Sequence, residues 1–348
     1  MSSDNNLERG FSAGRLLSWG ASLVILIAGL RAAQSVLVPI VFAVFIAVLG
    51  AGPMLWLKRH RVPKILAVLI VALTIIAVIS GIGVLLGTSV NEFTAELPKY
   101  RESLNETFAS LLDYLNGRGL DVSFATLFSL EPGAVMEVLG VTLKRLVGAL
   151  SSSVMVTILV IFMLFEAADF HAKIKLASSG GAIDFRRVEA MSIEIQRYLG
   201  IKTITSAVTG ITVGIWVSIM GVDFPLLWAF IAFLLNYIPF IGSIIASVPA
   251  IMLSIVVHGI PGAGLLAIGY VVINVGISNF LEPILMGRKL GLSPLVVLLS
   301  LVCWGWVWGP VGMLMSVPLT MTAKILLEHS KEFRWIAVLM EMGGKEKV

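Results

Sequence analysis

Residues 234–249 read Leu-Leu-Asn-Tyr-Ile-Pro-Phe-Ile-Gly-Ser-Ile-Ile-Ala-Ser-Val-Pro and lie in a long apolar stretch, residues 224–281, that has no Asp, Glu, Lys or Arg. Four residues interrupt the apolar pattern: Asn236, Tyr237, Pro239 and Gly242. Pro239 removes a backbone donor and clashes with the preceding helical turn. Hydrocarbon cannot satisfy the freed carbonyl groups, so such backbone persists at membrane depth only inside protein or beside a watery cavity. The stretch indicates a broken helix at a transport site; a proline kink that binds no ligand is the alternative.

The composition is that of an integral membrane protein. Hydrophobic residues make up 58% and charged residues 13% of the chain, and the mean hydropathy is +0.98, whereas a typical soluble domain is about 25% charged. The net charge of +4 comes from basic residues in short loops between apolar runs, so it indicates no nucleic-acid partner. The single cysteine, Cys303, excludes an intramolecular disulfide. We expect an all-α polytopic protein with about six full spans and two re-entrant helical hairpins, equivalent to about eight membrane segments.

Residues 1–91 are predicted to form an N-terminal unit of three spans. An uncleaved signal-anchor at 11–31 and a second span at 32–57 precede the loop 58–64, which carries four Lys or Arg residues and no acid. The positive-inside rule places this loop, and with it both termini, on the cytoplasmic side. The third span, 65–91, then leads outward.

Residues 92–145 are the one extended polar region and are predicted to be extracytoplasmic. Apolar residues recur there every three or four positions, which predicts an amphipathic helix that begins near Pro98 and stops at Gly117. A second stripe runs from Val135 to Leu146. These stripes can rest on the membrane, pack on each other or join protomers, and we favour an oligomer contact.

Residues 146–348 are predicted to form the transport unit. The run between Lys289 and Lys324 has no charge and must leave and return to one side, which allows each limb about 17 residues, short for two full spans. This parity predicts a second hairpin at 292–323 that enters from inside, and a first hairpin at 226–257 that enters from outside. Their similar sequences, Gly-Ser-Ile-Ile-Ala-Ser-Val-Pro and Gly-Met-Leu-Met-Ser-Val-Pro, suggest an inverted repeat. In the competing interpretation each hairpin is a single long, kinked span.

Few polar side chains are available to line a path. Asn274 and Asn279 lie in the crossing between the hairpins, where either can also serve as interhelical glue. Glu282 is a functional candidate because a carboxylate near the membrane is costly, although pairing with Arg288 or Lys289 is the structural alternative. Lys202 either snorkels to the headgroups or attracts a polar ligand at the cytoplasmic mouth, together with Tyr198 one turn earlier. The remaining candidates lie at the tip of the second hairpin: Gly309, Pro310 and Gly312.

Several of these motifs together resemble the autoinducer-2 exporter family of transporters. The matching stretches are 235–243 (Leu-Asn-Tyr-Ile-Pro-Phe-Ile-Gly-Ser), 281–293 (Leu-Glu-Pro-Ile-Leu-Met-Gly-Arg-Lys-Leu-Gly-Leu-Ser), Trp304-Gly305-Trp306, Gly309-Pro310-Val311-Gly312, and Tyr198, Lys202 and Thr203. The resemblance covers nearly the whole chain from about Leu16 and is weakest in the extracytoplasmic segment. It implies a bacterial inner-membrane transporter that releases the small polar signal autoinducer-2, as a homo-oligomer and specifically a pentamer.

Three classes of function stay open at this point. Relatives in this family are also assigned sodium (lithium)/proton antiport, which would use Glu282 as the titrating group, and a membrane scaffold without transport is the third class. No Gly-x-x-x-x-Gly-Lys-Ser/Thr loop is present, so active transport needs an ion gradient or a partner. The histidines have no metal-ligand spacing, and we expect no cofactor, no metal and no enzymatic reaction.

The sequence also suggests a mechanism. The hairpin tips at 236–242 and 305–312 would face each other and form the gate. Asn236, Tyr237 and Asn279 would hydrogen-bond the hydroxyl groups of the substrate, while Glu282 and Arg288 hold the cytoplasmic closure.

Overall fold

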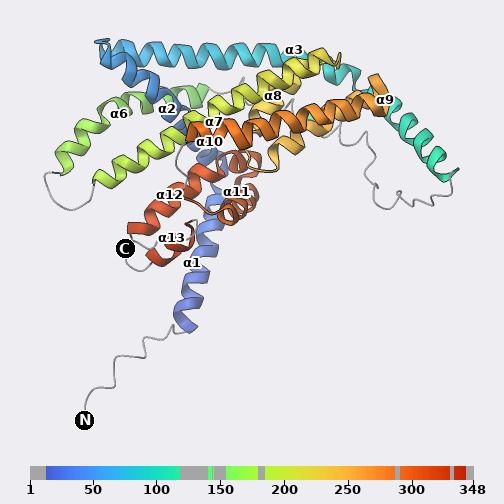
Figure 1. The fold of residues 1–348 in the computed structure, drawn as a ribbon. Coiled ribbons are helices and arrows are strands. Elements are labelled where there is room, and N and C mark those ends of the chain that lie inside the picture. Colours follow the sequence, from blue (N-terminus) through green and yellow to red (C-terminus); the bar gives the residue numbers. More distant parts are fainter. Residues whose placement is uncertain are drawn as a thin grey trace.

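The computed structural model describes residues 13–117, 140–142, 144, 154–178, 185–286, 291–329 and 333–341. Within these ranges the chain is helical and contains no strand, so the all-α prediction is confirmed. The helices follow one another as α1 (Ala13–Ala32), α2 (Gln34–Arg59), α3 (Lys64–Asn116), α6 (Val154–Ser178), α7 (Phe185–Ile219), α8 (Pro225–Leu235), α9 (Gly242–Gly276), the π-helix η1 (Ile277–Leu281), α10 (Glu282–Met286), α11 (Pro294–Leu314), α12 (Ser316–His329) and α13 (Arg334–Leu339) (Figure 1). In these ranges, five helical segments are long and apolar enough to cross a membrane: Gln34–Arg59, Lys64–Ser110, Ile193–Ile219, Gly242–Met286 and Pro294–Leu314.

The N-terminal helices differ from the predicted pair of spans. Only Ala33 separates α1 from α2, and its backbone keeps helical hydrogen bonds on both sides, to Gly29 and from Leu37, each at 2.9 Å. The chain therefore bends at Ala33 and does not reverse there, as Figure 1 shows for the blue helices. The three-span unit of residues 1–91 and the cytoplasmic N-terminus stay predictions.

Helix α3 joins the third span to the amphipathic segment. Its 53 residues make a rod of about 80 Å, against about 30 Å for the hydrocarbon core. Pro98 lies inside this helix, so the prediction that Pro98 starts a separate helix is wrong; a bend can absorb the proline clash when packing holds both sides. The helix ends just before Gly117, as predicted.

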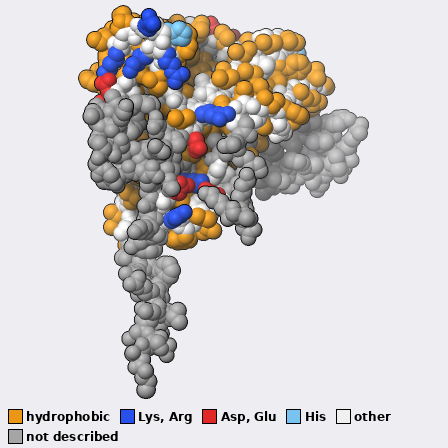
Figure 2. Space-filling model, turned by 60° about the vertical axis from the view of Figure 1, so that its left-hand side comes forward, with side chains coloured by type: hydrophobic (Ala, Val, Ile, Leu, Met, Phe, Trp, Pro, Cys, Tyr) orange, Lys and Arg blue, Asp and Glu red, His pale blue; other side chains and the backbone are white. Residues whose placement is uncertain are grey.

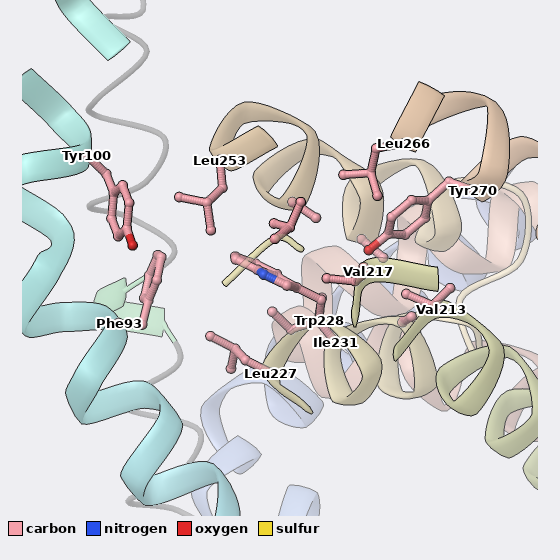
Figure 3. Packing of buried hydrophobic residues seen from close by; sticks show 14 of the residues in the cluster. Phe93, Tyr100, Val213, Val217, Leu227, Trp228, Ile231, Leu253, Leu266 and Tyr270 are labelled. Carbon is pink, nitrogen blue, oxygen red and sulfur yellow. The ribbon is translucent and has the colours of Figure 1, made fainter. Parts of the chain in front are cut away.

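The amphipathic stripe of α3 packs within the protein. Phe93, Tyr100 and Leu104 are buried in one cluster with residues of α7, α8 and α9. Trp228 lies at the centre of this cluster, and its ring meets that of Phe93 edge-on at 5.7 Å (Figure 3). This side of the stripe is thus covered inside the protomer. The second predicted stripe falls almost entirely outside the described residues.

Segment 226–257, which we call the first hairpin, folds back on itself. Helix α8 ends at Leu235, residues 236–241 turn, and α9 begins at Gly242. We call the turn at 236–241 the first tip. A further break lies at Gly259, whose φ of 67° falls in the left-handed region. A Cβ on Gly221, before α8, would lie 3.7 Å from His258 Nε2, so the two ends of the first hairpin meet.

Segment 292–323, the second hairpin, also folds back on itself. Helix α11 breaks at Gly309 (φ 64°, ψ −145°), and the chain returns through α12. Lys324 Nζ donates to the Gly291 carbonyl at 3.0 Å, so the second hairpin also begins and ends at one place. The insertion of either hairpin into a membrane from one side, the division of the chain into three units and the inverted repeat stay predictions.

Candidate functional site

Helix α7 carries a buried stripe of polar side chains. Lys202, Thr205, Ser206 and Thr209 are 6%, 0%, 0% and 2% exposed. Their spacing of three and four residues puts them on one face of the helix. The two threonines donate to their own helix, Thr205 to the Lys202 carbonyl at 3.1 Å and Thr209 to the Thr205 carbonyl at 2.9 Å. The stripe is therefore polar within an otherwise apolar segment. Some of its hydrogen-bonding partners come from other helices and turns.

Lys202 forms an ion pair with both carboxylate oxygens of Glu282. Its Nζ lies 3.1 Å from Glu282 Oε1 and 3.0 Å from Oε2, and the two side chains are only 8% and 19% exposed. The interpretation of Lys202 as a snorkelling residue is wrong, because its ammonium group is held inward by a carboxylate 80 residues away. Glu282 accordingly has a partner on another helix; Arg288 and Lys289 lie outside the described residues.

The π-helix η1 comes immediately before Glu282. A π-turn widens the helix by one residue and changes the direction of the side chains after it, and such turns are frequent at functional sites. Helix α10 starts with Glu282 and lies against α7. The local widening thus contributes to aiming the carboxylate at Lys202.

The first tip is tied to the same stretch of α7. Asn236 Nδ2 donates to Ser206 Oγ at 3.0 Å, and the Tyr237 hydroxyl donates to Thr203 Oγ1 at 2.7 Å. The Tyr237 ring lies between Phe45 and Phe233, which it meets edge-on at 5.7 and 5.8 Å. The stretch of α7 from Lys202 to Ser206 therefore binds both the first tip and Glu282.

A glycine allows the first tip to close. A Cβ on Gly242 would lie 1.8 Å from the Leu235 carbonyl oxygen, a distance that no side chain can occupy. Pro239 and Phe240 form the turn, and Phe240 has a positive φ of 63° without being glycine. This strained, closely packed turn is the broken helix that the sequence predicts.

The tip of the second hairpin, residues 305–312, has a similar glycine but different neighbours. A Cβ on Gly312 would lie 2.0 Å from the Trp304 carbonyl oxygen, next to the break at Gly309 and Pro310. Trp308 Nε1 donates to the Leu30 carbonyl of α1 at 3.0 Å. The first tip contacts α7 and α2, and a gate formed by the two tips stays a prediction.

The comparison with known proteins bears on this site. Residues 21–332 match the AI-2E family transporter family. The chain belongs to the AI-2E transporter family. It is 39% identical over 93% of its length to the AI-2 transport protein TqsA of Escherichia coli, of which it covers 94%. It is also 34% identical to the putative transport protein YhhT of the same organism (93% of both chains) and 35% identical to a putative transport protein of Haemophilus influenzae (96% of this chain, 98% of the relative).

Tyr198 of this AI-2E transporter is buried. It is 5% exposed and packs with Leu292, Val317 and Met321 of the second hairpin region. Tyr198 precedes Lys202 by one turn, so the end of the polar stripe is closed over by the second hairpin and not open as a mouth. The role of Tyr198 at a cytoplasmic mouth stays a prediction.

The two asparagines of the crossing differ in the AI-2E transporter. Asn274 Nδ2 donates to the Tyr270 carbonyl at 2.9 Å, while its Oδ1 is buried without a hydrogen-bond partner among the described residues. Asn279 lies exposed on η1, where it does not join Asn236 and Tyr237. The asparagine that keeps an unused buried acceptor is therefore Asn274.

Sequence reasoning missed two features of this site. Tyr270 is 2% exposed, and its hydroxyl is buried among apolar residues such as Val213 and Val217, with no hydrogen-bond partner in the described part of the chain (Figure 3). The hydroxyl residues of α7 were also missed, apart from Thr203. Their signal was present as polar residues at i, i+3, i+4 and i+7 within an apolar run. In the described ranges, no group of three or more His, Cys, Asp or Glu side chains could hold a metal ion.

Proposed function

We propose that this AI-2E family transporter exports a small, neutral, hydroxyl-bearing signal molecule, autoinducer-2, across the bacterial inner membrane. The proposal rests on the 39% identity to an AI-2 transport protein over nearly the full length of both chains. The observation that carries it is a hydrogen-bonding network at the first tip, in which Asn236 donates to Ser206 in a buried bond and Tyr237 donates to Thr203 in a part-buried one. These are uncharged donors and acceptors, the groups that recognise hydroxyls.

In this proposal the first tip is the gate, and it closes the path by binding to α7. A substrate hydroxyl competes for the Asn236 and Tyr237 side chains, and the tip leaves α7 when they change partners. The Lys202–Glu282 pair holds α10 against α7 while the path is closed. A homo-oligomer, specifically a pentamer, is the assembly that we propose.

The test is autoinducer-2 efflux from proteoliposomes of known protein orientation, with and without proton and sodium gradients. Ser206→Ala removes the acceptor of Asn236, and with it one hydrogen bond that holds the first tip closed against α7, so it should speed efflux by about fivefold to tenfold, the value of one hydrogen bond. Ser218→Ala is the matched control, because Ser218 lies exposed on the same helix and donates only to its own helix. Equal efflux by wild type, Ser206→Ala and Ser218→Ala would contradict the role of the network, and absent efflux from wild type would contradict the substrate.

A second candidate function, sodium (lithium)/proton antiport, is supported by one observation. Glu282 is an acid mostly buried beside a lysine, and a carboxylate that exchanges a lysine for a proton or a cation can couple the two fluxes. Sodium-driven proton movement that is lost in Glu282→Gln, together with no efflux of autoinducer-2, would favour this function.

A further inference from the structure

The corner between α2 and α3 carries exposed cationic side chains. Arg59, His60 and Arg61 are all exposed there, and Trp56, one turn earlier in α2, is 59% exposed. We refer to these four residues as the basic corner. Figure 2 shows Lys and Arg side chains gathered at one end of the molecule beside hydrophobic surface, the end at which α2 meets α3 in Figure 1.

The flanks of the basic corner are fixed to α6. Lys58 Nζ donates to the Ala168 carbonyl at 2.9 Å, and Lys64 forms an ion pair with Asp169. The two lysines are thus used inside the protein. Among the described residues, by contrast, no ion-pair partner is found for Arg59 or Arg61. The corner therefore presents two exposed guanidinium groups on a backbone that is already ordered.

The backbone at Arg61 is strained. Arg61 has a φ of 64°, and Val62 N donates to the Leu57 carbonyl while Arg61 N donates to the Lys58 carbonyl. This is the Schellman ending of a helix, in which the left-handed position is usually glycine because a side chain is disfavoured there. Strained non-glycine residues cluster at functional sites, so the Arg61 side chain is a candidate for a binding role.

The aromatic residue adds a second, independent indication. The His60 ring lies 4.2 Å from that of Trp56, and His60 Nδ1 is 2.9 Å from the Trp56 carbonyl oxygen. Exposed Trp at the end of an apolar helix lies at the level of the lipid headgroups. Arg59 and Arg61 come about one turn after Trp56, so we expect their guanidinium groups to reach the height of the lipid phosphates.

We propose that the basic corner is a binding site for an anionic phospholipid headgroup, whose phosphate is held by Arg59 and Arg61 while Trp56 lies in the interface beside it. Guanidinium groups bind phosphate oxygens through two parallel hydrogen bonds. A negatively charged leaflet attracts juxtamembrane cations, and the attraction weakens with salt. The site does not depend on which solute the protein transports.

The experiment measures phosphatidylglycerol bound to the purified full chain in phosphatidylcholine nanodiscs, at low and high salt. Arg59→Gln with Arg61→Gln should weaken binding by about tenfold at low salt and less at high salt. Lys99→Gln with Arg101→Gln removes the same charge from the far part of α3 and should leave binding unchanged. Equal losses in the two double variants, or no preference of the wild type for phosphatidylglycerol, would overturn the proposal.

A single substitution separates binding from folding. Arg61→Gly relieves the left-handed backbone and should raise the melting temperature in pure phosphatidylcholine by about 2 °C, while it weakens phosphatidylglycerol binding severalfold. Opposite signs for stability and binding support a lipid-binding role for Arg61. A variant that is more stable and binds phosphatidylglycerol as the wild type does would show that the side chain has no such role.

Discussion

At the scale of single residues, Lys202 and Glu282 are strongly dependent on each other. Both are mostly buried, and water can screen neither charge well. Removal of one partner leaves an uncompensated charge and should cost about 3–5 kcal/mol, whereas removal of both should cost much less. Lys202→Met and Glu282→Gln should each lower the unfolding temperature in detergent, and the double variant should recover most of the loss. Additive losses in this double-mutant cycle would contradict the pairing.

Replacement of two tyrosines by phenylalanine should change the stability of the protein in opposite directions. Tyr237 donates to Thr203, so Tyr237→Phe should destabilise the protein by about 1 kcal/mol. The buried Tyr270 hydroxyl has no partner among the described residues, so Tyr270→Phe should stabilise the protein by about 1 kcal/mol. Thermal unfolding of the two variants under one condition checks both signs.

Transport by the Tyr270 variant adds a second readout. A stabilised Tyr270→Phe protein with slower efflux would show that the hydroxyl is kept for the substrate or for water in the path. Efflux at the wild-type rate would remove Tyr270 from the path.

The residues of the first tip could be predicted from the sequence, but their partners could not. Asn236 and Tyr237 stood out because polar groups in hydrocarbon need an explanation. Their partners Ser206 and Thr203 lie 30 and 34 residues away, and Lys202 and Glu282 are 80 residues apart. Such pairings depend on how helices pack in three dimensions, which no local pattern records.

At the scale of elements, the first hairpin depends on the close approach of its two limbs. Gly242→Ala would place a methyl group 1.8 Å from the Leu235 carbonyl oxygen and should prevent the tip from closing. We expect poor folding. The control is Gly276→Ala in the same long helix, where a Cβ meets nothing within 4 Å and the helix should gain about 0.5–1 kcal/mol. Expression and unfolding temperature of both variants provide the measurement, and equal behaviour would contradict the closed tip.

The extent of each helix could be predicted well where a break has a chemical cause. The turn at 236–241 and the break at Gly309 result from proline and glycine in apolar runs. The continuous α3 and the bend at Ala33 could not be predicted in this way. Pro98 is tolerated because packing of Phe93 and Tyr100 holds the helix on both sides of it, a tertiary effect that outweighs local preference.

At the scale of the whole molecule, both hairpins return to where they start. Gly221 lies beside His258, and Gly291 beside Lys324. Helix α8 has 11 residues, about 16 Å, which is roughly half of the hydrocarbon core. A limb of this length cannot cross a bilayer alone. The geometry therefore favours entry and exit of the first hairpin on one side.

Cysteine labelling can test this arrangement in cells, because the chain has one native cysteine, Cys303, which can first be replaced by serine. Leu226→Cys and His258→Cys lie at exposed positions at the two ends of the first hairpin. A membrane-impermeant maleimide should label both from the outer face, because the ends of a re-entrant hairpin share a side. Arg59→Cys, on the basic loop, should react only after the membrane is permeabilised. If Leu226→Cys and His258→Cys react from opposite faces, the first hairpin is a kinked span, and the gate that we place at its tip would have to be located elsewhere.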